Sequence, residues 1–406
     1  MPITRLPLYC VCVCVVAFAG VVASGVIAGG VIVSGEVAPV APITKPHPQV
    51  IASGETQPVP SADDAADDPA LWVHPSDPSK SLILGTDKQH GLFTYSLDGA
   101  QRQALAVGRL NNVDVRQRVS GAKGTDVVVD IAAATNRTTK TVDLFLIDAQ
   151  GVVSPALTIA SGFTDPYGVC LYHSVATGKL YVFACDKPGL VRQWEVSISP
   201  DRKLAATEVR SFEVGSQSEG MVCDDQAGFL FIGEEQAGVW RYNAEPTAKD
   251  GEDTNKARTL ICAALPIGPL VADVEGLAIA RPAKGPAHLV VSSQGDNSYH
   301  LLDLAPPHAH RGSFVVSSLR ASKASDGGAV QETDGIEIYA APLPGYPGGI
   351  MIVQDGRNAP FPQNFKMLSW DAVLRSTALS AADASGKGSS VAGAPVINAK
   401  AAESKK

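Results

Sequence analysis

One sequence motif of three segments recurs six times along the middle of the chain, and this repeat constrains the fold more than any other feature of the sequence. Each copy opens with a polar or acidic residue ahead of a short apolar run. It continues with an apolar segment that ends in a polar cluster, and it closes with alternating apolar and polar residues. The copies begin 45 to 59 residues apart. They start at Asp67, Asn112, Pro166, Ser218, Val274 and Thr333.

This spacing is typical of propeller blades and differs from that of solenoid coils. The apolar segments are short and have period two, and no helix-length periodic segment separates them, which excludes a parallel sheet built from βαβ units. The 38 Gly and 28 Pro residues fit a fold with many tight turns. We therefore predict an all-β protein, a six-bladed β-propeller over residues 61–375 with antiparallel blades of four to five strands.

The two ends of the chain differ from this core in composition. From Leu6 to Gly35 there is no charged residue, and Arg5 directly precedes this run. The pattern predicts a secretory signal peptide or an N-terminal membrane anchor over residues 1–35, and hence a secreted or periplasmic protein. Residues 36–60 are rich in Pro and Val and are interpreted as a linker, and residues 376–406 are interpreted as a disordered tail.

The cysteines of the repeat region sit inside apolar segments. Cys170 and Cys185 flank the turn at Thr177-Gly178 almost symmetrically, so a disulfide across a hairpin is one interpretation. We favour buried free thiols, because a large core rarely needs a covalent cross-link. The prediction covers Cys170, Cys185, Cys223 and Cys262.

The charge balance argues against a nucleic-acid partner. There are 33 Lys and Arg residues against 41 Asp and Glu residues, a net charge of -8, and no basic run is present.

In a propeller the starts of the first strands and the ends of the second strands converge on one face. The acidic residues at these positions are Asp67, Asp68, Asp114, Glu219, Glu234, Glu235, Asp273, Glu275, Asp296, Asp334 and Asp355.

Carboxylates crowded in this way need protons, basic partners or a shared cation. Two like charges about 4 Å apart repel by ~4 kcal/mol at an effective dielectric constant near 20. An excess of hard oxygen ligands points to calcium. The repeat region contains no His-x-x-x-His pair and no cysteine cluster, which argues against zinc.

A set of basic residues occupies equivalent positions in successive repeats. Lys88, Arg137 and Lys187 each follow the second strand of their repeat, so they are expected to form one cationic sector that suits a phosphorylated ligand. A calcium-dependent lactonase or esterase propeller is an alternative, but its chemistry has no need of this sector. A non-catalytic propeller at the cell surface is another, and it would bind phosphate without turnover.

Several segments in the same order resemble the signature segments of the β-propeller phytases, from about residue 50 to 375. They are Asp64-Ala-Ala-Asp-Asp-Pro-Ala-Leu-Trp-Val, Asn111-Asn-Val-Asp-Val-Arg, Ser218-Glu-Gly-Met, Asp273-Val-Glu-Gly-Leu, Ser292-Ser-Gln-Gly and Asn364-Phe-Lys-Met. The resemblance implies a calcium-dependent bacterial 3-phytase, which removes phosphates from myo-inositol hexakisphosphate (phytate). It implies no protein partner, and we expect a monomer.

The resemblance also implies roles for individual residues. Several calcium ions would be held by Asp67, Glu219, Glu235, Asp273, Glu275 and Asp334. Among these, the catalytic acids would be Asp67, Glu219, Glu235 and Asp334. Substrate phosphate would be held by Lys88, Arg137, Tyr167 and Lys187. We hypothesise that a water activated by calcium attacks phosphorus directly, without a covalent intermediate.

The sequence departs from the family pattern at two places. The family has two successive lysines where this chain has Lys88 and Gln89, so one phosphate-binding charge is absent. The stretch Gly327-Gly-Ala-Val330 is less polar than in relatives. His90 could be proposed as a covalent nucleophile, but no Arg-His-Gly-x-Arg cradle surrounds it.

Overall fold

Each sequence repeat forms one sheet in the computed structural model, which describes residues 47–121, 126–246, 257–318 and 328–377. Blades are numbered 1 to 6 in chain order. Blades 1 to 3 consist of β3 (Ala66–Trp72), β4 (Leu82–Asp87), β5 (Gly91–Ser96) and β6 (Gln101–Leu105); β7 (Leu110–Ser120), β8 (Val128–Asn136), β9 (Thr141–Ile147) and β10 (Val153–Ala160); and β11 (Pro166–His173), β12 (Leu180–Asp186), β13 (Leu190–Ile198) and β14 (Leu204–Glu213). Blades 4 to 6 contain β15 (Ser218–Asp224), β16 (Phe229–Glu234), β17 (Gly238–Asn243) and β18 (Thr259–Ala263); β19 (Val274–Ala280), β20 (His288–Ser293), β21 (Ser298–Asp303) and β22 (His310–Ser317); and β23 (Ile336–Tyr339), β24 (Ile350–Asp355) and β25 (Asn364–Ser369).

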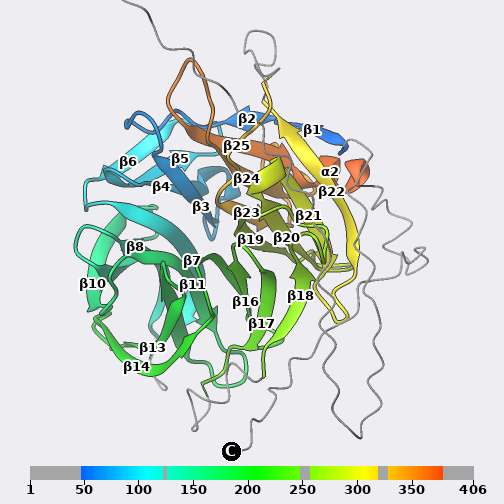
Figure 1. Cartoon of the computed structure of the whole chain (residues 1–406). Coiled ribbons are helices and arrows are strands. Elements are labelled where there is room, and N and C mark those ends of the chain that lie inside the picture. Colours follow the sequence, from blue (N-terminus) through cyan, green and yellow to red (C-terminus); the bar gives the residue numbers. More distant parts are fainter. Residues whose placement is uncertain (1–46, 122–125, 247–256, 319–327, 378–406) are drawn as a thin grey trace, which may run out of the picture. The chain divides into compact units, whose positions relative to one another are not determined.

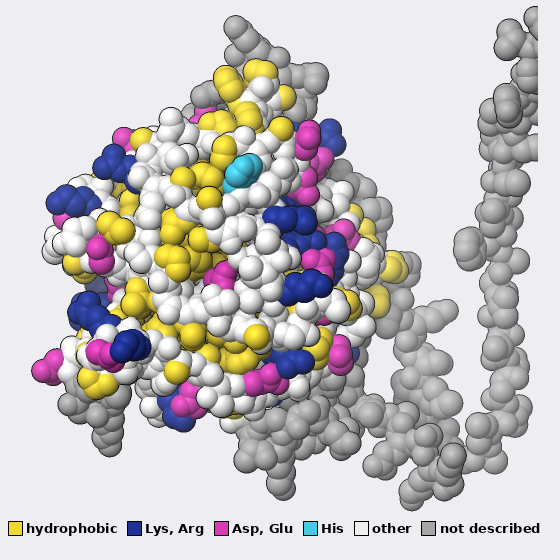
Figure 2. Space-filling view, turned by 90° about the vertical axis from the view of Figure 1, so that its left-hand side faces the viewer, with side chains coloured by type: hydrophobic (Ala, Val, Ile, Leu, Met, Phe, Trp, Pro, Cys, Tyr) yellow, Lys and Arg dark blue, Asp and Glu magenta, His cyan; other side chains and the backbone are white. Residues whose placement is uncertain are grey.

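The blades are arranged radially, which confirms the predicted six-bladed propeller (Figure 1). The first strand of each blade is innermost, and each of these strands contacts the first strand of the next blade. The contacts run from β3 through β7, β11, β15, β19 and β23 back to β3 and so close a ring. The space-filling view in Figure 2 shows a side face on which acidic and basic side chains are scattered in small groups among uncharged ones.

The core lies between the blades. Buried apolar side chains of the described residues form six clusters, and each cluster fills the interface between two neighbouring blades. Strand β12 shows how the period of two produces this arrangement. Leu180 and Val182 pack against blade 2, whereas Tyr181 and Phe183 pack against blade 4. Because both faces of a blade are covered, its middle strands are almost continuously apolar.

Two short N-terminal strands complete the last two blades. Strand β1 (Gln49–Ile51) pairs in parallel with β22 as a fifth strand of blade 5, and β2 (Gly54–Glu55) pairs antiparallel with β25 in blade 6. The predicted linker over residues 36–60 is therefore wrong in its second half, because residues from Gln49 onward belong to blades. At the other end, helix α2 (Trp370–Ser376) buries Trp370 in the core between blades 5 and 6. The same core buries Val330, so the less polar stretch noted in the sequence has a packing role there.

The remaining sequence predictions concern the two ends of the chain and the cysteines. The signal peptide or anchor over residues 1–35 lies outside the described residues, and so does the predicted tail over residues 376–406 apart from Ser376, which ends α2, and Thr377. Among the described residues, no helix is long and apolar enough to cross a membrane. Short 3-10 turns occur at η1 (Pro78–Lys80) and η2 (Gln294–Asp296). The expectation of buried free thiols is confirmed for Cys170, Cys185, Cys223 and Cys262.

Candidate active site

The inner strands carry their site residues in a β-bulge that is repeated from blade to blade. In blade 4, Ser218 pairs with Glu234 and Met221 pairs with Ile232, so the inner strand has one residue more than its partner between the two pairs. A bulge leaves residues unpaired and re-aims their side chains. Equivalent register shifts occur in the inner strands of blades 1 to 5, over Ala66/Pro69, Leu110/Val113, Pro166/Val169, Ser218/Met221 and Val274/Leu277.

A glycine follows the site residue at or just before the start of the inner strand in blades 3 to 6, and it allows the strands to come close together. A Cβ atom at Gly220 would lie 2.0 Å from the backbone oxygen of Glu275, and one at Gly276 would lie 2.6 Å from that of Asp334. These distances exclude any side chain without movement of the backbone. The dipeptides concerned are Tyr167-Gly168, Glu219-Gly220, Glu275-Gly276 and Asp334-Gly335. The Gly residues therefore bring the side chains before them into one ring, at the end of the channel that we call the mouth.

Two groups of buried carboxylates lie in the mouth and share one residue. The first carboxylate cluster consists of Asp67, Glu219 and Asp334, and one carboxylate oxygen of each residue lies within 4.8 Å of one such oxygen of the other two. The second carboxylate cluster consists of Glu219, Glu235 and Glu275, and one carboxylate oxygen of each residue again lies within 4.8 Å of one such oxygen of the others. Glu219 thus joins strands from opposite parts of the ring, as the repeat spacing predicted.

The crowding of these acids raises their pKa values. Burial, together with the neighbouring charge of Asp334, raises the pKa of Glu219 to about 7, against the opposing effect of Lys88. Burial and the charge of Glu219 raise the pKa of Glu275 well above its usual value. Burial also raises the pKa of Asp67, with Asp334 adding to the effect. A bound cation would therefore offset the burial and the mutual repulsion that raise the pKa values of these carboxylates.

The donor set fits a hard divalent cation. Oδ2 of Asp67, Oε1 of Glu235 and Oε2 of Glu275 are buried and have no hydrogen-bond partner among the described residues. Buried carboxylate oxygens without a donor are costly unless a cation binds them. All the ligand atoms are oxygen, which suits Mg²⁺ or Ca²⁺ and not Zn²⁺. The two carboxylate clusters can therefore hold metal.

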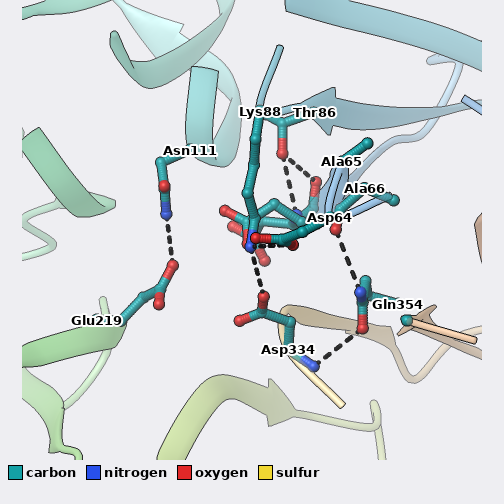
Figure 3. A network of polar contacts seen from close by, with 12 residues as sticks. Asp64, Ala65, Ala66, Thr86, Lys88, Asn111, Glu219, Asp334 and Gln354 are labelled. Carbon is teal, nitrogen blue, oxygen red and sulfur yellow. Dashed lines mark hydrogen bonds and ion pairs between the residues drawn. The ribbon is translucent and has the colours of Figure 1, made fainter. Parts of the chain in front are cut away.

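Lys88 is inserted into the first carboxylate cluster (Figure 3). Its Nζ atom lies 3.1 Å from Asp64 Oδ1, 3.0 Å from Asp67 Oδ1 and 3.0 Å from Asp334 Oδ2. Burial alone would lower the pKa of Lys88, but the charges of Asp334 and Asp67 outweigh burial and raise it. Gln89, which replaces the family's second lysine, donates to the backbone oxygens of residues 62 and 64 and so holds this loop.

The other predicted phosphate-binding residues lie beside the second carboxylate cluster. The Lys187 Nζ atom is 5.0 Å from the centre of the Tyr167 ring, and the Arg137 guanidinium carbon is 6.0 Å from it. The Tyr167 hydroxyl hydrogen-bonds with Glu219. Burial and the charge of Glu219 raise the pKa of Tyr167, so the phenol stays protonated and able to donate. Of the predicted cationic sector, Arg137 and Lys187 lie together beside Tyr167, whereas Lys88 lies within the first carboxylate cluster.

Some predicted members of the ring lie elsewhere. Asp273 is at the edge, where it accepts a hydrogen bond from Gln236, and it belongs to neither carboxylate cluster. Asp114 was expected at the mouth, but it forms an ion pair with Arg116, 2.9 Å away, in a cavity of about 280 Å³ deeper in the channel. Asp355 pairs with Lys366 in blade 6.

The sequence prediction missed two residues that hold the predicted ones in place. Asn111 donates through Nδ2 to Glu219 Oε1 and accepts at Oδ1 from Arg137, 3.2 Å away. Asp165 accepts two hydrogen bonds from the Arg137 guanidinium, each 2.8 Å long. Both residues directly precede predicted repeat starts, Asn112 and Pro166, and this position was the available signal.

Comparison with known proteins agrees with the geometry. The family model described as Phytase matches residues 18–384. A 3-phytase from Bacillus subtilis (strain 168) is 37% identical over 344 residues, which is 81% of this chain and 85% of that protein. Among solved structures, a chain from the crystal structure of BBS1N in complex with ARL6DN, soaked with lead, covers 73% of this chain and 78% of its own length at a TM-score of 0.39 and 10% identity. On the family match and the bacterial relative, this chain belongs to the phytase family and is a phosphoric monoester hydrolase.

Proposed function

We propose that this phytase hydrolyses the phosphate monoesters of phytate with Ca²⁺ held in its two carboxylate clusters. The observation that carries the proposal is the sharing of Glu219 between these clusters beside the cationic sector. A doubly anionic phosphate would otherwise be repelled by the carboxylates in the mouth. The bacterial relative is a 3-phytase, which supports phytate as the substrate.

Five carboxylates would hold the metal. Asp67, Glu219 and Asp334 form one ligand group, and Glu219, Glu235 and Glu275 form the other. When bound, Ca²⁺ would neutralise charge on the carboxylates and on phosphate oxygens and would make a water more acidic. Asp273, which the resemblance placed among the ligands, is left out because it lies outside both clusters.

The cationic sector would bind and orient the substrate. Lys187 forms no ion pair with a described carboxylate within 4.0 Å, so its ammonium group is available to phosphate. Arg137 uses Nε and one NH2 hydrogen for Asp165 and one NH1 hydrogen for Asn111, which fixes the guanidinium and leaves its other N–H groups for an anion. The protonated Tyr167 hydroxyl adds a neutral donor.

The residues at the mouth favour direct attack by water. The side chains that converge there are carboxylates, cations, an amide and a phenol. His90, the alternative nucleophile, contacts Ser61 Oγ through Nδ1 at 2.6 Å and has an exposed side chain. A carboxylate at the mouth can accept the proton that an attacking water loses.

Release of inorganic phosphate from phytate tests this proposal. Activity should disappear with a chelator and return with added Ca²⁺, and thermal melting should rise with Ca²⁺ in the absence of substrate. Phytate binding without release would indicate a non-catalytic platform, and lactone hydrolysis without phosphate release would indicate the esterase alternative. Full phosphatase activity in chelator would contradict the proposed role of the metal.

A further inference from the structure

Two buried thiols from neighbouring blades are in contact. Cys170 lies on β11 in blade 3 and Cys223 on β15 in blade 4, and their Sγ atoms are 3.6 Å apart. Their residues are 0% and 4% exposed. We propose that Cys170 and Cys223 are a site of oxidative cross-linking, at which a hydroperoxide forms a disulfide that joins blades 3 and 4.

The surrounding backbone holds the two sulfurs near bonding distance. On one side, a Cβ atom at Gly168 would lie 1.9 Å from the backbone oxygen of Glu219, so β11 and β15 touch there. On the other side, the His173 backbone N–H donates to Asp225, 3.2 Å away. The cysteines lie between these contacts. An S–S bond is about 2.05 Å long, so the sulfurs have to approach by roughly 1.5 Å, which small side-chain rotations can supply.

One of the two thiols can be reached from the channel. Cys223 lines the deeper cavity of about 280 Å³, together with Arg116 and Asp225. Cys170 is screened from the cavity, and burial raises the pKa of its thiol. Cys223 is therefore the thiol that meets the oxidant, and Cys170 is the thiol that resolves the product.

The reaction balances in two steps. The Cys223 thiol attacks one oxygen of hydrogen peroxide, the O–O bond breaks, and the products are Cys223 sulfenic acid and one water. The Cys170 sulfur then attacks the Cys223 sulfur, the S–O bond breaks, and the released hydroxyl takes up the Cys170 proton to leave as a second water. The two thiols lose two electrons in total, and the peroxide gains them.

The cross-link would act on the strands that carry the site. Tyr167 lies on β11 and Glu219 on β15, and the cysteines are 53 residues apart in sequence. A disulfide across a loop of this length restricts the unfolded chain. We expect the midpoint of thermal unfolding to rise by about 5 °C on oxidation and to fall back with a reductant.

Mass spectrometry of the full chain treated with hydrogen peroxide tests the site. We expect the intact mass to fall by two hydrogen atoms and non-reducing peptide mapping to identify a link between Cys170 and Cys223. Cys170→Ala and Cys223→Ala should each abolish the mass loss and the thermal shift. Cys262→Ala, at a buried thiol of the same blade 4, should change neither.

Three outcomes would overturn the proposal: an unchanged mass, oxygen addition at Cys223 without a cross-link, or a link that involves Cys185 or Cys262. If an alanine variant fails to fold, the peptide map of the unmodified sequence still decides, because it identifies the linked residues directly. Neither result depends on phytate hydrolysis, which is measured separately.

Discussion

Asn111 in blade 2 donates a hydrogen bond to the Glu219 carboxylate in blade 4. The same amide accepts from Arg137, so one side chain connects the Arg137 guanidinium to the carboxylate that both acidic clusters share. Asn111 therefore holds the Arg137 guanidinium at a fixed distance from the Glu219 carboxylate. Asn111 touches the reacting groups only through these partners and is a positioning residue.

Replacing Asn111 with Asp should change the pH profile as well as the rate. A further carboxylate beside Glu219 would raise the pKa of Glu219 above about 7 and would attract Arg137. We expect Asn111→Asp to lower kcat/KM by roughly 10-fold or more at neutral pH and to move the acidic limb to higher pH. Asn111→Ala should lower the rate with a smaller movement, because it removes a hydrogen bond to Glu219 but adds no charge. Identical profiles for the two variants would rule out the electrostatic role.

Replacing Lys88 should increase metal affinity while it reduces turnover. The Lys88 ammonium contacts Asp67 and Asp334 at 3.0 Å, so it competes with a cation for the first carboxylate cluster. We expect Lys88→Met to bind Ca²⁺ roughly 10-fold more tightly by titration calorimetry, yet to hydrolyse phytate poorly. Lys187→Met is the matched control, because Lys187 lies over Tyr167 and not in that cluster. Equal gains in affinity would indicate a general charge effect only.

Calcium binding should release protons near neutral pH. The pKa of Glu219 is about 7 in the metal-free fold, and a bound cation favours the carboxylate. Below this pKa the acid has to lose a proton before it can bind. The apparent Kd for Ca²⁺ should therefore rise as the pH falls from 8 to 6, by up to about 10-fold per unit below the pKa. Calorimetry in buffers of different ionisation enthalpy measures the protons released, and Glu219→Gln should release fewer. Constant affinity over this range would contradict the assignment.

The close approach of the inner strands should make Gly220 intolerant of a side chain. A Cβ atom there would lie 2.0 Å from a backbone oxygen of the next blade. We expect Gly220→Ala to lower the free energy of unfolding by roughly 3 kcal/mol or more in urea titrations. Gly178, at a φ of 71° with no atom within 4 Å of its Cβ position, is the control. Gly178→Ala should cost only about 1 kcal/mol. Similar losses would show that strand approach is not the cause.

A buried lysine should hold the N-terminal strand β2 to blade 6. Lys366 Nζ lies 2.7 Å from Glu55, 3.2 Å from Asp355 and 2.8 Å from Asn358, and its side chain is 0% exposed. Lys366→Met would leave buried carboxylates unpaired, which costs about 3–5 kcal/mol. Denaturant unfolding measures this loss. The double variant Lys366→Met with Asp355→Asn should recover part of it, and no recovery would mean that packing rather than charge is responsible.

Repetition explains why so much of the fold could be predicted from the sequence. Apolar segments with a period of two, spaced as propeller blades are, specify the sheets. Glu219 was predicted at the site because it opens the first strand of its repeat, and Lys187 because it follows the second strand of its repeat. The short β1 and β2 carry no period, since three and two residues cannot show one. Their pairing depends on partners near the other end of the chain.

The misplacement of Asp114 has a local cause. It pairs with Ala133 in the regular part of β7 beyond the bulge between Leu110 and Val113, whereas Glu219 lies within the equivalent bulge of β15. The sequence shows that Asp114 is polar, but it does not show that β7 has one residue more than its partner strand β8 between Leu110 and Val113. Asp165 was missed for a different reason, because an acidic residue before Pro166 is ordinarily part of a turn.

The pairing of β1 with β22 and of β2 with β25 also sets an order of events during synthesis. The first strands to leave the ribosome cannot find their places until almost the whole propeller has followed them. A chain that stops before Asn364 has no β25, so blade 6 stays open beside Asp334 and Asp67. Premature termination would therefore leave the first carboxylate cluster beside an incomplete blade, even though most of the blades had been made.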